Sequence, residues 1–393
     1  MRIIGGYNHY IYAIFDDYMI KRILQSRIAS SLYSGKAILL LGPRQVGKTT
    51  LIREILKNES YLFLNADDAI VREQLSAPGV HKLKSIIGKH TLVFIDEVQR
   101  LEEAGLTLKL IVDEFTNVQV VASGSSALEL SSKINEPLTG RKWEYHLFPI
   151  SWEELEGTEG FLEAESQLEH RLIYGMYPDV INNPGLETRI IQQLGESYLY
   201  KDILSMTHIR KPELLDRLLK ALALQVGNEV SYNELAQLLQ VDKGTVMAYL
   251  DLLEKSFIIF RLRSFSRNIR NEIKNNRKIY FWDNGIRNFL IANFNSLDLR
   301  QDKGALWENF LIAERMKYLA YHQVLANSYF WRTVQQQEID YVEDRNGELP
   351  AFEFKWKHSS KSKTPSNFLA AYQKLATVVS RDNFRSFVGP VSG

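Results

Sequence analysis

Residues 42–49 have the sequence Gly-Pro-Arg-Gln-Val-Gly-Lys-Thr and fit the phosphate-binding pattern G-x-x-x-x-G-K-[ST] at every position. The glycines allow the backbone to curl so that its N–H groups point at phosphates, and the following helix adds the positive end of its dipole. In such a loop the lysine reaches the β- and γ-phosphates and the threonine hydroxyl ligates Mg²⁺. The pattern therefore predicts ATP and Mg²⁺ as cofactors, held at Gly42, Pro43, Arg44, Gln45, Val46, Gly47, Lys48, Thr49 and Thr50.

A second apolar segment, residues 91–97, ends in the two carboxylates Asp96 and Glu97. An acid at such a position can hold the water shell of Mg²⁺, and its neighbour can polarise the attacking water. We therefore assign Asp96 to magnesium and Glu97 to the catalytic base. An ordinary glycine turn between a strand and a helix is the alternative for residues 42–49, and it does not account for this second element.

Strands and helices alternate between residues 36 and 150, which predicts a parallel sheet with helices on its faces. Ser125 follows the last candidate strand; its hydroxyl can lie beside the γ-phosphate, or it can belong to a serine-rich turn that caps the next helix. Arg141 follows a glycine and can reach a nucleotide in the same chain or, in a homo-oligomer, across a subunit boundary; an arginine that faces solvent is the alternative. The candidate strands are 37–41, 61–65, 91–95 and 118–123.

These motifs resemble prokaryotic AAA-type P-loop ATPases that carry a C-terminal DUF4143-like domain of unknown function. The similarity extends from about residue 19 to the C-terminal region through the segments 95–99, 123–127, 140–155, 174–178 and 280–285. It implies an AAA-like ATPase core, a winged-helix segment and a C-terminal nuclease-like fold. It also implies that Ser125 acts as a sensor of the nucleotide and Arg141 as an arginine finger.

Length and composition limit the class of protein. The chain has 393 residues, which predicts two or three domains, and 45% of its residues are hydrophobic, enough for sizeable cores. It has no cysteine, so disulfides and cysteine-ligated metals are excluded, in keeping with a reducing cytoplasm. No apolar run approaches 18 residues, so we expect no membrane partner. The net charge of +1 means that any nucleic-acid surface must be local.

The fold class expected from these patterns is α/β, with five regions along the chain. Residues 1–18 are rich in aromatic and turn residues and are expected to form a peripheral strap or an extension. The predicted divisions are an N-terminal extension and helix (1–35), a P-loop ATPase core (36–150), a helical lid (151–212), a winged helix-turn-helix (213–295) and a restriction-endonuclease-like domain of the PD-(D/E)xK type (296–393).

Residues 213–282 have the pattern of a winged helix-turn-helix. Ser231 and Asp242 stand where they can cap two successive helices, and 257–263 alternates like a wing strand. Seven basic residues in and after this strand suit a phosphate backbone, which predicts non-specific DNA contact. A winged helix that serves only as a packing module is the alternative. The basic residues are Arg261, Arg263, Arg267, Arg270, Lys274, Arg277 and Lys278.

A predicted β-hairpin at 338–357 holds the second candidate site. Its Asn346-Gly347 turn is of the favoured two-residue type I′, which places Asp340 opposite Glu353 and Glu338 opposite Lys355. Residues two apart on a strand share a face, so Phe352, Phe354 and Trp356 are expected on the other, buried face. Pro350 could bulge the strand and change this register. A following helix at 367–374 and a strand at 384–387 are also expected.

Two carboxylates that face each other repel unless a cation such as Mg²⁺ lies between them. Asp340 followed by Glu353-x-Lys355 is similar to the arrangement of PD-(D/E)xK nucleases, and Glu308 supplies the upstream glutamate of that pattern. The resemblance implies metal binding by Glu308, Asp340 and Glu353, and catalysis by Asp340, Glu353 and Lys355. The alternatives are an exposed hairpin with a cross-strand salt bridge, and an inert nuclease fold that docks nucleic acid or protein.

Overall fold

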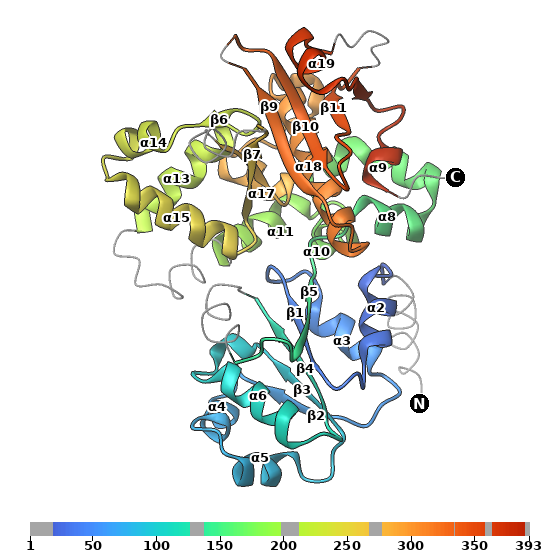
Figure 1. Cartoon of the computed structure of the whole chain (residues 1–393), viewed down its shortest axis with the longest axis vertical. Helices are drawn as coiled ribbons and strands as arrows, with labels where there is room; N and C mark the ends of the chain where they lie inside the picture. The colour runs from blue at the N-terminus through green and yellow to red at the C-terminus, as the bar shows by residue number, and fades with distance from the viewer. Residues whose placement is uncertain are drawn as a thin grey trace, which may run out of the picture.

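The computed structural model describes residues 19–125, 137–197, 212–266, 277–333, 335–357 and 364–389. It has two lobes (Figure 1). We call residues 19–146 the first lobe and residues 151–389 the second lobe, and a short linker, 147–150, joins them. The strap expected at residues 1–18 lies outside the described residues.

The first lobe is built on a five-stranded parallel sheet with the order β2-β3-β4-β1-β5. β1 and β3 are buried along their whole length because helices cover both faces, which is why their sequences are continuously apolar rather than alternating. All four strands expected from the sequence are confirmed to within one residue at either end. The strands are β1 (Ala37–Leu41), β2 (Leu62–Asn65), β3 (Leu92–Asp96), β4 (Gln119–Gly124) and β5 (Lys142–His146).

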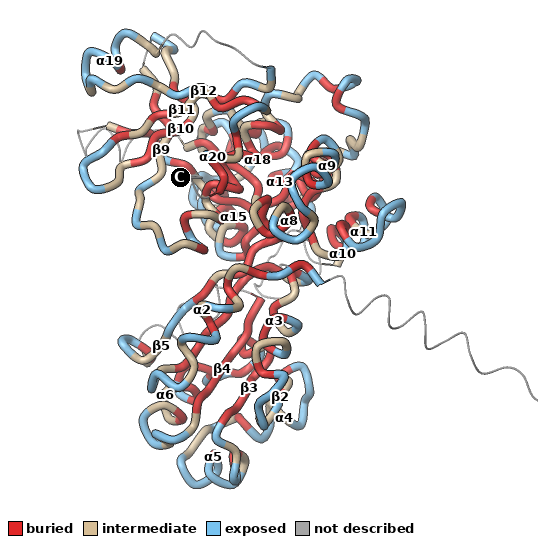
Figure 2. The backbone as a smooth tube through the Cα atoms, turned by 90° about the vertical axis from the view of Figure 1, so that its right-hand side faces the viewer, coloured by how far each residue is buried: buried red, intermediate tan, exposed pale blue. Residues whose placement is uncertain are grey.

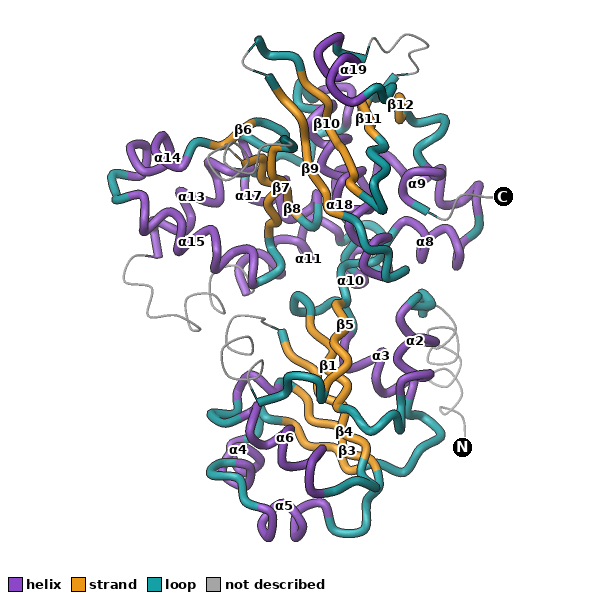
Figure 3. The backbone as a smooth tube through the Cα atoms, in the orientation of Figure 1, coloured by secondary structure: helices purple, strands orange, loops and turns teal. Residues whose placement is uncertain are grey.

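Helices surround this sheet and leave the carboxyl ends of its strands facing the second lobe (Figures 1 and 3). Buried residues follow the strands of the sheet in the first lobe and gather in the centre of the second lobe (Figure 2). The elements are α2 (Leu24–Ser31), α3 (Lys48–Ile55), α4 (Ala69–Leu75), α5 (Val80–Ile87), η1 (Val98–Arg100) and α6 (Ala104–Glu114).

The second lobe begins with a helical layer, as expected. A capping box between Ser151 and Glu154 starts its first helix, and Pro178 occupies the first turn of α10. Ser231 and Asp242 cap α14 and α15, as their positions predicted. The helices of this lobe are α8 (Trp152–Glu159), α9 (Phe161–Tyr174), α10 (Pro178–Asn182), α11 (Glu187–Leu194), α13 (Pro212–Leu224), α14 (Tyr232–Leu239), α15 (Lys243–Lys255), α17 (Asn284–Leu290), η3 (Leu297–Leu299), α18 (Lys303–Tyr321), α19 (Ser366–Tyr372) and α20 (Arg385–Val388).

A seven-stranded mixed sheet with the order β12-β11-β10-β9-β7-β8-β6 forms the rest of this lobe. β7 pairs with β9, so one sheet continues across the expected boundary at residues 295–296. α18 packs against β8 and β11 and buries one face of the sheet. The strands are β6 (Glu229–Val230), β7 (Ile259–Ser264), β8 (Arg277–Phe281), β9 (Asn327–Arg332), β10 (Glu338–Asp344), β11 (Ala351–Phe354) and β12 (Ala376–Val379).

The β10–β11 hairpin has the predicted register, with Tyr341 paired to Phe352. Asn346 and Gly347 both have positive φ angles, 53° and 81°, as a type I′ turn requires. The carbonyl of Pro350 accepts a hydrogen bond from Glu343 N at 3.0 Å, so proline does not break this pairing. The irregularity in β10 lies on its other side, against β9.

The strand expected at 384–387 is wrong, because this segment forms the helix α20. Phe384, Phe387 and Val388 are its buried residues, and their i, i+3, i+4 spacing is helical. The expected helix at 367–374 is confirmed as α19. The edge strand on this side of the sheet is β12, which pairs in parallel with β11.

Candidate nucleotide-binding site and the carboxylate cluster of the second lobe

The P-loop connects the end of β1 to the start of α3. A Cβ atom on Gly42 would lie 2.0 Å from the carbonyl oxygen of Leu147, so only glycine fits where the linker crosses the loop. Gly42 and Gly47 have φ angles of 156° and 91°, which L side chains rarely adopt. The loop therefore needs its glycines both for its own curvature and for contact with the linker between the lobes.

Lys48 is 6% exposed and stands at the first position of α3. Its Nζ donates to the carbonyl oxygens of Gly42 at 2.9 Å and Pro43 at 2.7 Å. Burial lowers the pKa of Lys48 to about 8, although the Glu97 and Asp96 carboxylates act in the opposite direction. A buried ammonium whose charge is this weakly compensated favours an anionic ligand.

Asp96 and Thr49 lie together at the end of β3. Thr49 Oγ1 donates to Asp96 Oδ2 at 2.8 Å, and the Ser123 hydroxyl contacts Asp96 Oδ1. Hydroxyl and carboxylate oxygens beside a phosphate loop are the ligands that Mg²⁺ takes in P-loop proteins. The donor set therefore fits a magnesium ion, and the roles assigned to Thr49 and Asp96 remain predictions.

Glu97 follows Asp96 with a φ angle of 53°, a left-handed conformation that is uncommon outside glycine. Its carboxylate accepts a hydrogen bond from the Gln99 side chain. Gln99 Nε2 also donates to Ser125 Oγ at 2.8 Å, and Ser125 N donates to Gln99 Oε1 at 3.3 Å. Gln99 thus links the predicted base Glu97 to the predicted sensor Ser125, and this role was not predicted from the sequence.

A cavity of about 720 Å³ opens beside the P-loop. It lies between the start of α3, the segment 19–25 and α10, and Asp179 and Asn182 contribute polar groups to its wall. This volume is within the range of small-molecule sites, and it adjoins Gly47 and Thr50 of the loop. The sequence predicted a helical lid from residues 151–212, and α10 lies within that range, but it did not identify Asp179 and Asn182 as wall residues.

Arg141 lies at the opposite end of the sheet from the P-loop. Its carbonyl accepts from Ala37 N at 2.9 Å, at the start of β1, whereas the P-loop follows the end of that strand. Five residues of strand separate the two, roughly 16 Å. Its guanidinium donates to Asp113 at 2.6 Å. The expected contact within one chain is therefore not formed, and action across a subunit boundary stays a prediction.

In the second lobe, a buried lysine stands among the predicted metal ligands. Lys278 on β8 is 1% exposed, and its Nζ lies 3.1 Å from Glu308 Oε1 on α18 and also pairs with Glu338 on β10. The Tyr280 hydroxyl donates to the same Glu308 oxygen at 2.6 Å. Burial opposes the charge of Lys278, yet Glu308, Glu338 and Asp340 raise its pKa well above the ordinary value.

Asp340 is the third carboxylate of this cluster, and its side chain is partly buried. Burial and the neighbouring Glu308 raise its pKa to about 7, while Lys278 acts in the opposite direction. Asp340 Oδ2 accepts from Phe354 N at 2.7 Å, so part of its hydrogen-bonding capacity is used by the hairpin. Glu338 pairs with Lys278 and Arg332 rather than with the expected Lys355, whose side chain is exposed.

The predicted metal ligands Glu308, Asp340 and Glu353 do not converge in this structure. No three Asp, Glu or His side chains within the described ranges lie close enough to hold a metal ion. The ammonium of Lys278 supplies the positive charge for which Mg²⁺ was predicted. The donor set does not fit a metal as arranged, and the catalytic roles of Asp340, Glu353 and Lys355 stay predictions.

The basic residues grouped as a DNA surface have different environments. Arg261 pairs with Glu254 and with Asp251, at 2.7 Å from the latter, and Lys278 is buried in the carboxylate cluster. Neither offers a free charge to a phosphate backbone. The remaining members include Arg263 and Arg277, which the structure describes, and Arg267, Arg270 and Lys274, which lie outside the described residues.

Comparison with known proteins also separates the first lobe from the second. A family model described as an AAA domain matches residues 34–156. Two models described as domains of unknown function, DUF8612 and DUF4143, match residues 165–298 and 303–386. The first lobe is thus of the AAA P-loop type. The expected combination of such a domain with a C-terminal DUF4143-like domain is confirmed.

Similar proteins cover most of the chain. An uncharacterized protein of Mycobacterium tuberculosis is 27% identical over 352 residues, 88% of this chain and 75% of that protein. One of Haemophilus influenzae is 25% identical over 334 residues, 80% of this chain and 78% of that protein. A Walker-type ATPase of Pyrococcus abyssi has a similar structure, with a TM-score of 0.49 and 18% identity over 70% of this chain and 96% of that one.

Proposed function

We propose that this protein binds and hydrolyses Mg²⁺–ATP at the P-loop of its first lobe. The observation that carries this proposal is the contact of Thr49 with Asp96 at 2.8 Å, beside the buried Lys48 and next to Glu97. An anion-binding loop, a metal-binding pair of oxygens and a general base are thereby within one small region. These are the parts that phosphoryl transfer to water requires.

Each residue has a distinct part in the proposed reaction. The N–H groups of the loop and the ammonium of Lys48 hold the phosphates, and Thr49 and Asp96 would hold Mg²⁺. The ion would neutralise charge on the β- and γ-phosphates. Glu97 polarises the attacking water, and the hydrogen bond from Gln99 fixes its carboxylate. Ser125, joined to Gln99, is placed to respond when the γ-phosphate leaves.

The nucleoside would occupy the cavity between the P-loop and α10. Its polar lining by Asp179 and Asn182 provides groups that can bond to a base or a ribose. In a homo-oligomer, Arg141 could reach the nucleotide of a neighbouring subunit, which its position at the far edge of the sheet does not allow within its own chain.

For the second lobe, we favour a docking scaffold over a nuclease. The order α13, β6, α14, α15, β7 and β8 supports the winged-helix interpretation, and the mixed sheet with α18 supports a nuclease-like fold. The buried Lys278 is the specific observation against cleavage, because it already compensates Glu308 and Glu338. Non-specific DNA is the docking partner that we propose for this lobe.

The test compares purified wild type with Lys48→Ala, Glu97→Gln and Asp340→Ala variants. ATP turnover in the wild type that is lost in the first two variants would support the ATPase. The absence of turnover in the wild type, with nucleotide binding also absent, would contradict it. Incubation with Mg²⁺ and a mixture of supercoiled, linear and single-stranded DNA tests whether the second lobe cleaves DNA. Cleavage that is lost in Asp340→Ala would show that this lobe is a nuclease and not a docking scaffold.

A further inference from the structure

The two lobes meet at the P-loop, and one side chain from the N-terminal part of the chain connects them. Arg22 precedes α2 and is 8% exposed. Its Nη1 donates to the carbonyl oxygen of Val46, inside the P-loop, at 2.8 Å. Its Nη2 donates to the carbonyl oxygen of Phe148, in the linker, at 2.6 Å and to the Tyr321 hydroxyl at 3.2 Å. One guanidinium thus joins the loop, the linker and the end of α18.

The remaining nitrogen of this guanidinium is also bonded. Arg22 Nε donates to Glu154 Oε1 at 3.1 Å, and the other oxygen of Glu154 closes the capping box of α8 by accepting from Ser151 N at 3.0 Å. The Arg22–Glu154 pair is buried on both sides. Buried charge-assisted hydrogen bonds of this kind fix geometry, because moving one partner leaves the other charge uncompensated.

Tyr321 makes a second bond that ties it to the same place. Its hydroxyl accepts from Phe148 N at 3.0 Å, so the tyrosine at the end of α18 holds both the linker backbone and Arg22. The side chain of Tyr321 is fully buried. Two connections therefore lead from this tyrosine to the P-loop. The side-chain connection runs from Tyr321 to Arg22 and to the carbonyl of Val46. The other runs through the linker, where Leu147 N donates to the carbonyl oxygen of Leu41, directly before the loop, at 2.7 Å.

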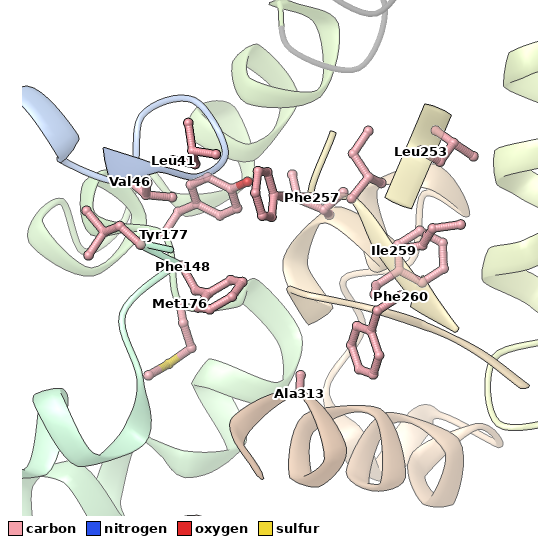
Figure 4. Close-up of a cluster of buried hydrophobic side chains, with 14 of the residues drawn as sticks. Leu41, Val46, Phe148, Met176, Tyr177, Leu253, Phe257, Ile259, Phe260 and Ala313 are labelled. Carbon is pink, nitrogen blue, oxygen red and sulfur yellow. The ribbon is translucent and has the colours of Figure 1, made fainter. Parts of the chain in front are cut away.

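Packing around these bonds is continuous across the lobes. Figure 4 shows Leu41, directly before the P-loop, and Val46, inside it, beside Phe148 and Tyr177. The Phe148 ring stacks on Trp282 with centroids 4.1 Å apart. If the P-loop moves when phosphate binds, it will therefore displace packed side chains of the second lobe.

We propose that Arg22 is a positioning residue of the ATPase and that the Val46–Arg22–Tyr321 contacts couple nucleotide binding to the second lobe. This inference rests on the proposed ATPase function. Arg22 holds the P-loop in the shape that receives phosphates, and the hydroxyl of Tyr321 holds Arg22. By linkage, a change in the second lobe that disturbs this contact alters nucleotide affinity, and nucleotide alters the second lobe by the same factor.

The decisive variant is Tyr321→Phe, because it keeps the ring and removes only the hydroxyl. We expect about a 3- to 10-fold weaker affinity for Mg²⁺–ADP by calorimetry, the size of one or two lost hydrogen bonds. The KM for ATP should rise by the same factor and kcat should stay within about twofold, because the loop holds the ground state and the transition state alike. Arg22→Ala should show a larger effect of the same kind.

Tyr341→Phe is the matched control. Tyr341 is also fully buried in the second lobe, and its hydroxyl bonds to Ser328 at 2.7 Å, far along the sheet from the P-loop. A general loss of stability would affect both variants, whereas coupling through Arg22 affects only Tyr321→Phe. Amide hydrogen exchange in residues 317–322 should also slow on Mg²⁺–ADP binding in the wild type and not in Tyr321→Phe.

The outcomes separate this inference from the proposed function. A wild type that does not bind nucleotide would overturn the ATPase proposal and this inference with it. A wild type that binds normally, beside a Tyr321→Phe variant of unchanged affinity and KM, would overturn the inference alone. Equal loss of affinity in Tyr321→Phe and Tyr341→Phe would also overturn it, since the effect would then be one of overall stability.

Discussion

Each lobe buries a lysine near carboxylates, and the two lysines have opposite properties. Burial lowers the pKa of Lys48 in the first lobe to about 8, and its ammonium donates to two backbone carbonyls. In the second lobe, three carboxylates outweigh burial and raise the pKa of Lys278, which forms ion pairs with Glu308 and Glu338. The first lysine is ready for an external anion, and the second is satisfied inside the protein.

This difference shows why a cluster of charged residues is not by itself a site. In both places a motif puts acids and a lysine together, and a sequence pattern cannot distinguish them. What distinguishes them is whether the buried charges compensate each other before a ligand arrives. On this criterion the P-loop is incomplete without a ligand, whereas the carboxylate cluster of Lys278, Glu308, Glu338 and Asp340 is complete.

The largest expected effect separates the two clusters by catalysis. Glu97→Gln should lower kcat for ATP hydrolysis by about 10²- to 10⁴-fold, the usual contribution of a general base. Glu308→Gln changes a carboxylate of the other cluster in the same way and should leave kcat unchanged. Steady-state phosphate release measures both. Equal activity of Glu97→Gln and wild type would show that the water is activated by another group.

The second effect concerns the charge of Lys278. Lys278→Met should lower the free energy of unfolding by about 2–4 kcal/mol, because it leaves the partly buried Glu308 and Glu338 without their cation. Millimolar Mn²⁺ should then restore part of the stability, since the vacated position offers oxygen ligands. Thermal unfolding with and without Mn²⁺, in the absence of nucleotide, measures this.

Lys317→Met is the control for that variant. Lys317 is also 1% exposed and forms an ion pair with Glu314 at 2.7 Å, with Asp283 nearby, whereas Lys278 forms ion pairs with two carboxylates. Lys317→Met should be less stable than wild type, and Mn²⁺ should not restore its stability. If Mn²⁺ stabilises the wild type as strongly as Lys278→Met, then Lys278 does not close the site and the nuclease interpretation regains its basis.

The third effect is a dependence of stability on pH. The pKa of Asp340 is about 7 in the folded protein, above the value of ~3.9 in an unfolded chain. Between these values the folded state holds a proton that the unfolded state has lost, so stability falls as pH rises from 4 to 7. Asp340→Asn should therefore raise the free energy of unfolding by up to about 4 kcal/mol at pH 8 and change it little at pH 4.

Asp302→Asn should act with the opposite sign. Burial opposes the charge of Asp302, but hydrogen bonds from Arg300 and Arg287 lower its pKa to about 2. Its stabilising effect is present above the unfolded value and is lost as pH falls through the folded one. This variant should be less stable than wild type at pH 8. Parallel pH profiles for the two variants would contradict the assigned environments.

Much of the fold followed from local patterns in the sequence. β1 and β3 are continuous apolar runs, and such runs between turn residues have few other interpretations. The edge strand β5 has the sequence Lys-Trp-Glu-Tyr-His, which is not an apolar run, and it was not predicted. The Asn346-Gly347 turn fixed the register of the hairpin, since a two-residue type I′ loop leaves one pairing. Helix α20 was mistaken for a strand because four residues are too few for periodicity to decide.

The contacts between distant segments could not be predicted. Arg22 and Tyr321 are 299 positions apart, and nothing in either segment indicates the other. Lys278 was assigned to a DNA surface because it stands in a run of basic residues. The alternation of β8 held a signal, since Lys278 and Tyr280 share a face and both contact Glu308. A DNA-facing lysine and a buried lysine paired with Glu308 can be distinguished only when α18 is known to lie against that face.

The smallest expected effect tests whether the charge of Lys48 is poorly compensated before a nucleotide binds. With a pKa of about 8, Lys48 is mostly charged at pH 7 and mostly neutral at pH 9 in the free protein. Phosphates at the P-loop restore its charge, so nucleotide binding should take up close to one proton at pH 9 and close to none at pH 7. Affinity for Mg²⁺–ADP should fall about tenfold between these pH values, which is ~1.4 kcal/mol.

Calorimetry in buffers of different ionisation enthalpy measures the proton uptake directly. Lys48→Arg is the control, because a guanidinium remains charged at pH 9 and takes up no proton on binding. Its affinity, although lower overall, should not vary over this pH range. Proton uptake that persists in Lys48→Arg would assign the titration to another group. Uptake that is absent from the wild type would mean that the lysine is already charged, and the two buried lysines would then differ in partners but not in their readiness for a ligand.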